Sequence, residues 1–123
     1  MRFLLYIISA SVFISCNSGN KTDVLSFKEG HFKTYLGERK DSSNLYRTKD
    51  LQIEYYRNQT DTFHIHWISN FEYELLKVNP KSKLDSIPFK VRITAIKNNY
   101  YKFRGAYQGS DFIQTGTTHI IQE

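Results

Sequence analysis

The sequence predicts an all-β domain of seven or eight short antiparallel strands, a meander that forms a small barrel, a half-barrel or a sandwich. From residue 27 onward, apolar side chains recur at every second position, and no stretch keeps the 3.6-residue period of a helix. Turn residues interrupt these runs about every 8–12 positions, and parallel crossovers would need roughly a dozen residues or more. With 123 residues, we expect a single domain over 27–123.

Three segments show the clearest alternation, and turn residues follow each of them. They are residues 51–56, 63–68 and 89–96. Apolar residues of a half-buried strand face the core, so we expect Leu51, Ile53 and Tyr55 to share the buried face of the first segment. Large buried rings dominate small cores, and Trp67 is the expected centre of this one.

Weaker strand patterns complete the domain. They cover residues 31–36, 44–48, 72–78, 100–107 and part of 112–121. We expect Tyr101 and Phe103 to point inward, Gly105 to form a bulge or bend, and Gly116 to interrupt the last strand. Residues 79–88 form the longest connection and contain both prolines.

The first fifteen residues are expected to be a signal peptide. Arg2 precedes an apolar run over 3–14, which as a helix would be about 18 Å long, against roughly 30 Å of bilayer hydrocarbon. Residues 13–16, Phe-Ile-Ser-Cys, resemble the lipobox of bacterial lipoproteins. That resemblance implies cleavage before Cys16, a diacylglyceryl group on its sulfur, and acylation of its amine by a fatty acid such as palmitate. The alternative is an ordinary secretory signal with a chance cysteine.

Residues 16–26 are then an acylated cysteine and a flexible polar tether. Two or more acyl chains hold a protein stably on a membrane. Asn17 follows the cysteine where an Asp would favour the inner membrane, so resemblance to lipoprotein sorting patterns implies the outer membrane, facing the periplasm. Without Arg2, 16 of the 17 Lys and Arg remain against 12 Asp and Glu, a formal charge of +4. These charges are dispersed, which is typical of a solvated surface with at most a weak preference for anionic lipid.

His64 and His66 are the most suggestive pair for a metal, because residues i and i+2 of a strand project from one face. His31 or His119 could supply a third ligand. The alternative is that His64 and His66 lie on the solvent face, opposite Trp67. A pair of histidines is a weak signal and a closed zinc site takes four ligands, so we expect no metal and no cofactor.

Other residue patterns give little support for catalysis or nucleic-acid binding. Glu72 and Glu74 share a strand face, whereas hydrolytic carboxylates face each other across a cleft. Residues 100–104 interleave aromatic and basic side chains, as single-strand nucleic-acid binders do, but alternation divides them between two faces. The chain has no nucleophile, metalloprotease or phosphate-loop motif, and its only cysteine is at the lipidation position. We therefore expect neither an enzyme nor a nucleic-acid partner.

Two short motifs are candidates for glycosylation. Asp85-Ser86-Ile87 resembles the Asp-Ser/Thr-aliphatic site at which exported Bacteroidota proteins carry O-linked sugar, which makes Ser86 the acceptor. Asn58 begins an N-glycosylation sequon that a bacterial lipoprotein would seldom use.

The strand patterns also resemble a group of small Bacteroidota lipoproteins of unknown function. The likeness rests on segment 47–54, with Arg-Thr and then Gln-Ile-Glu, and on segment 65–75, with its Trp strand and Glu-Tyr strand. It covers about residues 27–104 and implies no activity. From their residue types, we expect strand-core and turn positions for the matching residues, with Arg47 and Glu72 exposed.

Three functions follow from these expectations. The first is a lipid-anchored envelope protein whose β domain binds or stabilises an envelope protein or another unassigned ligand. The second is a carrier, because small barrels can hold one small apolar molecule, although a core rich in Tyr, Phe and Trp favours a filled interior. The third is an inhibitor of a host hydrolase, which a +4 charge disfavours for a basic lysozyme.

Overall fold

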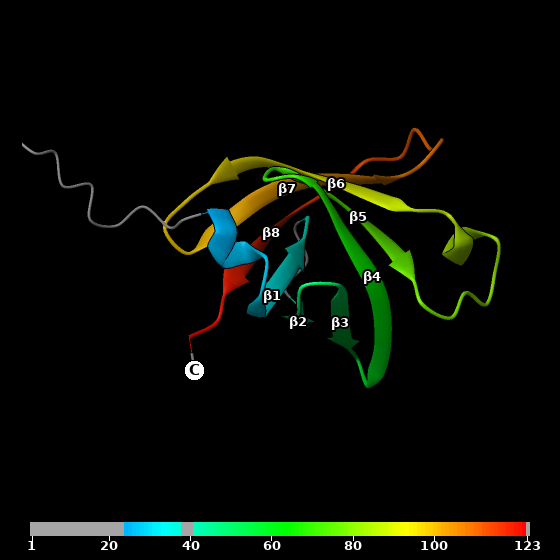
Figure 1. The fold of residues 1–123 in the computed structure, drawn as a ribbon, viewed down its shortest axis with the longest axis horizontal. Coiled ribbons are helices and arrows are strands. Elements are labelled where there is room, and N and C mark those ends of the chain that lie inside the picture. Colours follow the sequence, from blue (N-terminus) through cyan, green and yellow to red (C-terminus); the bar gives the residue numbers. More distant parts are fainter. Residues whose placement is uncertain (1–23, 38–40, 123) are drawn as a thin grey trace, which may run out of the picture.

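The computed structural model describes residues 24–37 and 41–122 of the chain. In them, antiparallel strands β1 to β8 follow one another in sequence order, and β8 pairs with β1 to close a barrel (Figure 1). The strands are β1 (Gly30–Leu36), β2 (Ser42–Arg47), β3 (Leu51–Tyr56), β4 (Gln59–Ser69), β5 (Glu72–Lys77), β6 (Phe89–Ile96), β7 (Tyr100–Tyr107) and β8 (Gln114–Ile120). The predicted all-β meander is confirmed in its closed form.

Two single-turn helices accompany the barrel. They are η1 (Val24–Phe27), which precedes β1, and η2 (Leu84–Ser86), which lies in the long connection between β5 and β6. The described ranges contain no helix with the length and apolar character needed to cross a bilayer. The predicted signal peptide, Cys16 and most of the tether lie outside the described residues.

The two ends of the barrel differ in how they are closed. At one end η1 places Phe27 inside, fully buried, with its ring edge-on to Tyr101 at a centroid distance of 4.9 Å. We call this the covered end; the β2–β3, β4–β5 and β6–β7 connections lie there. The β1–β2, β3–β4, β5–β6 and β7–β8 connections surround the opposite end, which we call the mouth.

The centre of the core differs from the sequence expectation. Tyr101, Phe27 and Phe32 are its most deeply buried large side chains. Trp67 is only partly buried and packs against this cluster, with its ring 4.7 Å from that of Tyr73. The expectation was wrong because η1, which the strand pattern did not include, brings Phe27 into the position that the tryptophan was expected to fill.

Strand β3 faces the opposite way from the prediction. Gln52 is inside, with 2% of its surface exposed, and Tyr55 is outside, with 43% exposed. Side chains alternate along a strand, so Leu51 and Ile53 lie on the outer face. There Ile53 is opposite Tyr46 of β2, while the inner face pairs Gln52 with Arg47. The prediction assumed that the polar residues of β3 face the solvent. It failed because the buried Arg47 requires a polar partner in the interior, and Gln52 supplies it.

The glycines of β7 and β8 leave space for phenylalanine rings. Gly105 forms no bulge and Gly116 no break, since both stay in register with their neighbours. A Cβ at Gly105 would lie 2.6 Å from the ring of Phe89, and one at Gly116 would lie 2.7 Å from the ring of Phe103. The bulges occur instead between Trp67 and Ser69 and between Ile93 and Ala95.

Candidate functional site

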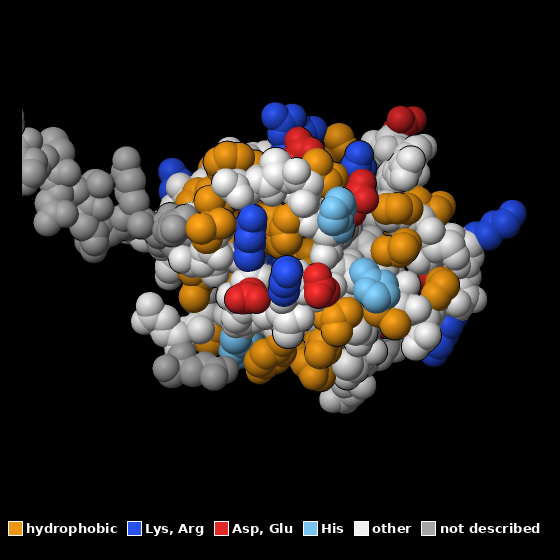
Figure 2. Space-filling view, in the orientation of Figure 1, with side chains coloured by type: hydrophobic (Ala, Val, Ile, Leu, Met, Phe, Trp, Pro, Cys, Tyr) orange, Lys and Arg blue, Asp and Glu red, His pale blue; other side chains and the backbone are white. Residues whose placement is uncertain are grey.

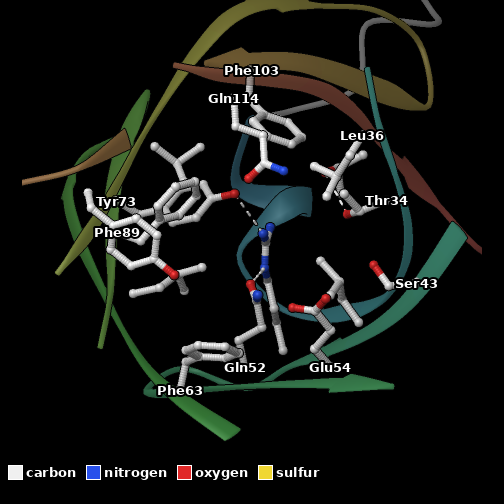
Figure 3. Close-up of a pocket in the computed structure, with 16 residues that line it drawn as sticks. Thr34, Leu36, Ser43, Gln52, Glu54, Phe63, Tyr73, Phe89, Phe103 and Gln114 are labelled. Atoms are coloured by element: carbon white, nitrogen blue, oxygen red, sulfur yellow. Dashed lines mark hydrogen bonds between the residues drawn. The ribbon is translucent and has the colours of Figure 1, made fainter. Parts of the chain in front are cut away.

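A cavity of about 160 Å³ occupies the mouth half of the barrel interior (Figure 3). Its apolar wall is formed by Leu36, Leu45, Phe63, Leu75, Phe89, Val91 and Phe103. Its polar lining includes Thr34, Ser43, Arg47, Gln52, Glu54, Gln114 and Thr118. The sequence argument for a filled interior is therefore wrong for this half of the barrel, where aromatic side chains line the wall and leave space between them.

Arg47 forms the floor of this cavity, at the boundary with the covered end. It is the last residue of β2, and the alternation of that strand points it inward, where only 4% of its surface is exposed. Its Nε donates to Oε1 of Gln52 at 2.9 Å, and its Nη1 donates to the backbone oxygen of Phe27 at 2.9 Å. Arg47 thereby attaches η1 to the strands. Arg47 was expected to be exposed, and its burial shows that this expectation was wrong.

Two tyrosine hydroxyls complete the set of partners of Arg47. Its Nη2 donates to the hydroxyl oxygens of Tyr73 at 2.9 Å and Tyr101 at 2.8 Å, and these hydroxyls are 2.8 Å from each other. The guanidinium carbon is 4.8 Å from the ring centroid of Tyr73 and 5.1 Å from that of Phe32. Aromatic faces within about 6 Å stabilise a cation, so the rings supply part of what water would provide.

Arg47 keeps its positive charge in the barrel interior. Burial lowers the pKa of Arg47, but the hydroxyl oxygens of Tyr101 and Tyr73 outweigh that effect and raise it above its usual value. Burial also raises the pKa of Tyr73 well above its ordinary value, against the opposing effect of Arg47. Tyr73 therefore stays protonated, and the floor of the cavity has a positive charge.

An ion-pair cluster joins two hairpins at the mouth. Asp41, just before β2, accepts hydrogen bonds from the hydroxyl of Tyr56 at 2.8 Å and from Nη2 of Arg57 at 2.7 Å. Those bonds, with that of Tyr56 the larger cause, lower the pKa of Asp41 to about 2. Arg57 and Asn58 form the β3–β4 turn with positive φ angles of 45° and 63°, as a type I′ turn requires. This cluster restrains the rim of the mouth on the side of β3.

The histidines considered as metal ligands do not converge. His64 and His66 lie exposed on the outer face of β4, as the alternative predicted. His31 and His119 lie on β1 and β8, on the other side of the eight-stranded barrel. Within residues 24–37 and 41–122, no group of three or more His, Cys, Asp or Glu side chains could hold a metal ion.

Charged side chains are interspersed on the outer surface (Figure 2). The two glutamates of β5 face β6, where Glu74 pairs with Lys90 at 3.7 Å and Glu72 with Arg92 at 3.9 Å. Glu72 is partly buried, so its expected exposure was only partly right. These carboxylates form cross-strand ion pairs on the outside, not a catalytic pair in a cleft.

The remaining candidates lie where the alternation and loop patterns placed them. Tyr101 and Phe103 are buried, while Lys102 and Arg104 are exposed, so the aromatic and basic residues of 100–104 form no common face. Ser86 is exposed in η2, and its hydroxyl donates to the backbone oxygen of Ser82 at 3.3 Å. Whether Ser86 bears a sugar stays a prediction.

Sequence reasoning missed Arg47 and Gln52, the two residues that define the cavity floor. A local signal existed: Ser43, Leu45 and Arg47 alternate along one face of β2, and Leu45 is the apolar member of that face. Comparisons with protein-family models, curated proteins and solved structures found no match for this chain. The candidate site therefore rests on its geometry.

Proposed function

We propose that this chain is a lipid-anchored binding protein of the cell envelope whose barrel holds one small, largely apolar molecule in the mouth cavity. The observation that carries the proposal is the cavity itself, which is walled by aliphatic and aromatic side chains and bounded by a few polar groups. Binding sites for small molecules typically have this composition. An engineered cavity of about 150 Å³ takes up benzene, so 160 Å³ suits a ligand with a single ring or a short branched chain.

Binding is better supported than catalysis by the chemistry of the lining. The described lining contains no histidine and no cysteine, and the hydroxyls of Thr34 and Thr118 form a hydrogen bond with each other at 2.9 Å. Glu54 is the one acidic side chain among the described lining residues, so a pair of carboxylates for acid–base work is not assembled there.

The anchor is the part of the proposal that rests on sequence. Val24, the first described residue, begins η1 at the covered end. A tether from Cys16 would therefore join the barrel opposite the mouth, and leave the mouth unobstructed at the periplasmic face of the outer membrane. We expect the intact mass of the native protein to correspond to a chain that begins at Cys16 and carries acyl groups. Cys16→Ser should abolish both features, and Ser18→Ala should preserve both; a native chain that retains residues 1–15 contradicts the anchor.

Toluene uptake by the full chain tests the binding cavity. Leu75 lines the cavity with 8% of its surface exposed, whereas Leu76, its neighbour on β5, points outward with 38% exposed. Leu75→Trp should fill the cavity, and Leu76→Trp adds the same group on the outer face. By titration calorimetry we expect toluene to bind the wild-type chain and Leu76→Trp alike, and to bind Leu75→Trp at least tenfold more weakly.

Two outcomes would overturn the proposed cavity function. One is no measurable heat of toluene binding to the wild-type chain. The other is equal binding by Leu75→Trp and Leu76→Trp, because a ligand on the outer surface would not distinguish the two sites. A folded state of both variants, checked by circular dichroism, makes the comparison valid.

A further inference from the structure

We infer that the ligand of the mouth cavity is a small carboxylic acid that enters with its carboxylate toward Arg47 and its apolar group toward the mouth. This inference rests on the proposed binding function and specifies the class of molecule bound. Three features of the described residues carry it: a buried cation without a counter-charge among them, more hydrogen-bond donors than acceptors around it, and an acidic side chain, Glu54, between that cation and the mouth.

The charge of Arg47 is not neutralised by any acidic residue that the structure describes. None of the ion pairs in residues 24–37 and 41–122 includes Arg47. Its hydrogen-bond partners are an amide, a backbone carbonyl and two phenols. A buried charge is costly unless it is paired as well as hydrogen-bonded. An anion in the adjoining cavity would supply the missing partner in a site of low dielectric constant, where the attraction is strong.

Donors outnumber acceptors at the cavity floor. A guanidinium has five N–H donors, and the four hydrogen bonds of Arg47 leave one on Nη1 unused in the described part of the chain. Gln52 uses its carbonyl oxygen for Arg47, and its amide N–H groups have no partner among the described residues. Of the Tyr73 and Tyr101 hydroxyls, whichever accepts the bond between them keeps a proton to donate.

A carboxylate matches this surplus because it only accepts hydrogen bonds and has two oxygens to receive them. Hydrogen bonds from a charged donor to a charged acceptor are also among the stronger ones in proteins. Figure 3 shows Gln52 and Tyr73 pointing toward the same central region of the barrel. A carboxylate in that region would meet donors from β2, β3 and β5 together.

The axis of the cavity favours one orientation of such an acid. Strand β3 runs from the covered end to the mouth, so Glu54 lies nearer the mouth than Gln52. A ligand carboxylate near the mouth would meet the acid group of Glu54, while one at the floor meets Arg47. Phe89, the first residue of β6, lies at the mouth end of that strand, and Phe63 lies in the middle of β4, opposite Gln52; both rings provide an apolar wall for the ring or branched chain.

A comparison of benzoate with benzamide tests whether the cavity prefers a negatively charged ligand, because the two probes are nearly isosteric and only benzoate is an anion. Trp67 is the single tryptophan of the chain, and its ring lies 5.9 Å from the guanidinium carbon of Arg47, so its fluorescence should report binding at the floor. We expect benzoate to bind the full wild-type chain at least tenfold more tightly than benzamide. Arg47→Met should remove this preference, whereas Arg104→Met, on the outer face of β7, should retain it.

The outcomes separate this inference from the proposed function. If toluene binds in the cavity but benzoate binds no more tightly than benzamide, the acid specificity is wrong and the cavity function stands. If none of the three probes binds, both are wrong. The comparison of benzoate with benzamide on the wild-type chain tests the acid specificity even if Arg47→Met does not fold. A benzoate preference that Leu75→Trp leaves unchanged places the site outside the barrel and also overturns the inference.

Discussion

Replacing Arg47 by methionine should lower the free energy of unfolding by about 3 kcal/mol, since buried groups left without a hydrogen-bond partner cost about 1–3 kcal/mol each. The change would leave the carbonyl oxygens of Gln52 and Phe27 without the donor they now have. It would also remove the attachment between η1 and the barrel. Part of this loss is offset because an unpaired buried cation disappears, which keeps the expected value well below the sum of the four bonds.

Urea denaturation followed by circular dichroism measures this effect, with Arg104→Met as the matched control. Arg104 is exposed on the outer face of β7, so its replacement should change the free energy of unfolding by less than about 0.5 kcal/mol. A loss of under about 1 kcal/mol for Arg47→Met would contradict the view that Arg47 holds the covered end together.

Gly116→Ala should also be strongly destabilising. We expect it to lower the free energy of unfolding by about 3 kcal/mol, at the upper end of the cost of overpacking a core. A Cβ at Gly116 would overlap the backbone oxygen of Tyr35 and lie 2.7 Å from the ring of Phe103. Tyr35 belongs to β1, and β1–β8 pairing closes the barrel. A backbone atom cannot rotate away as a side chain can, so the two strands must separate or twist.

Gly105→Ala is the matched control, because it adds the same methyl group to the neighbouring strand. There the close atoms belong to the far end of the Phe89 ring, at 2.6 Å, which can turn aside. We expect a loss of about 1 kcal/mol, and urea denaturation of both variants makes the comparison. Equal losses, or a smaller loss for Gly116→Ala, would show that the closing strand pair tolerates the added atom.

Much of the fold was predictable because strand signals are local. The two-residue period of Phe63, Ile65 and Trp67 and that of Phe89, Val91 and Ile93 identified strands and their inward faces correctly. Short turns then required antiparallel neighbours. Whether the first and last strands of such a meander pair depends on the whole sheet, not on a local pattern. The sequence therefore could not distinguish a closed barrel from a half-barrel or a sandwich.

The cavity floor was not predictable, because its contacts join residues distant in the chain. Arg47 meets Phe27, Tyr73 and Tyr101, which are 20, 26 and 54 positions away. The apolar pattern of β3 also concealed Gln52, since an inward polar residue is stable only beside a partner that the pattern does not identify. The lipidation of Cys16, by contrast, is a local motif, and it stays a prediction.

Intermolecular NOEs between toluene and the methyl groups of the full chain show whether the ligand lies inside the barrel, because they identify the side chains next to it. We expect NOEs to the methyl groups of Leu45, Leu75 and Val91, which line the cavity, and none to those of Leu76 on the outer face. NOEs confined to outward-facing methyl groups such as those of Leu76, with none to the three interior residues, would contradict it.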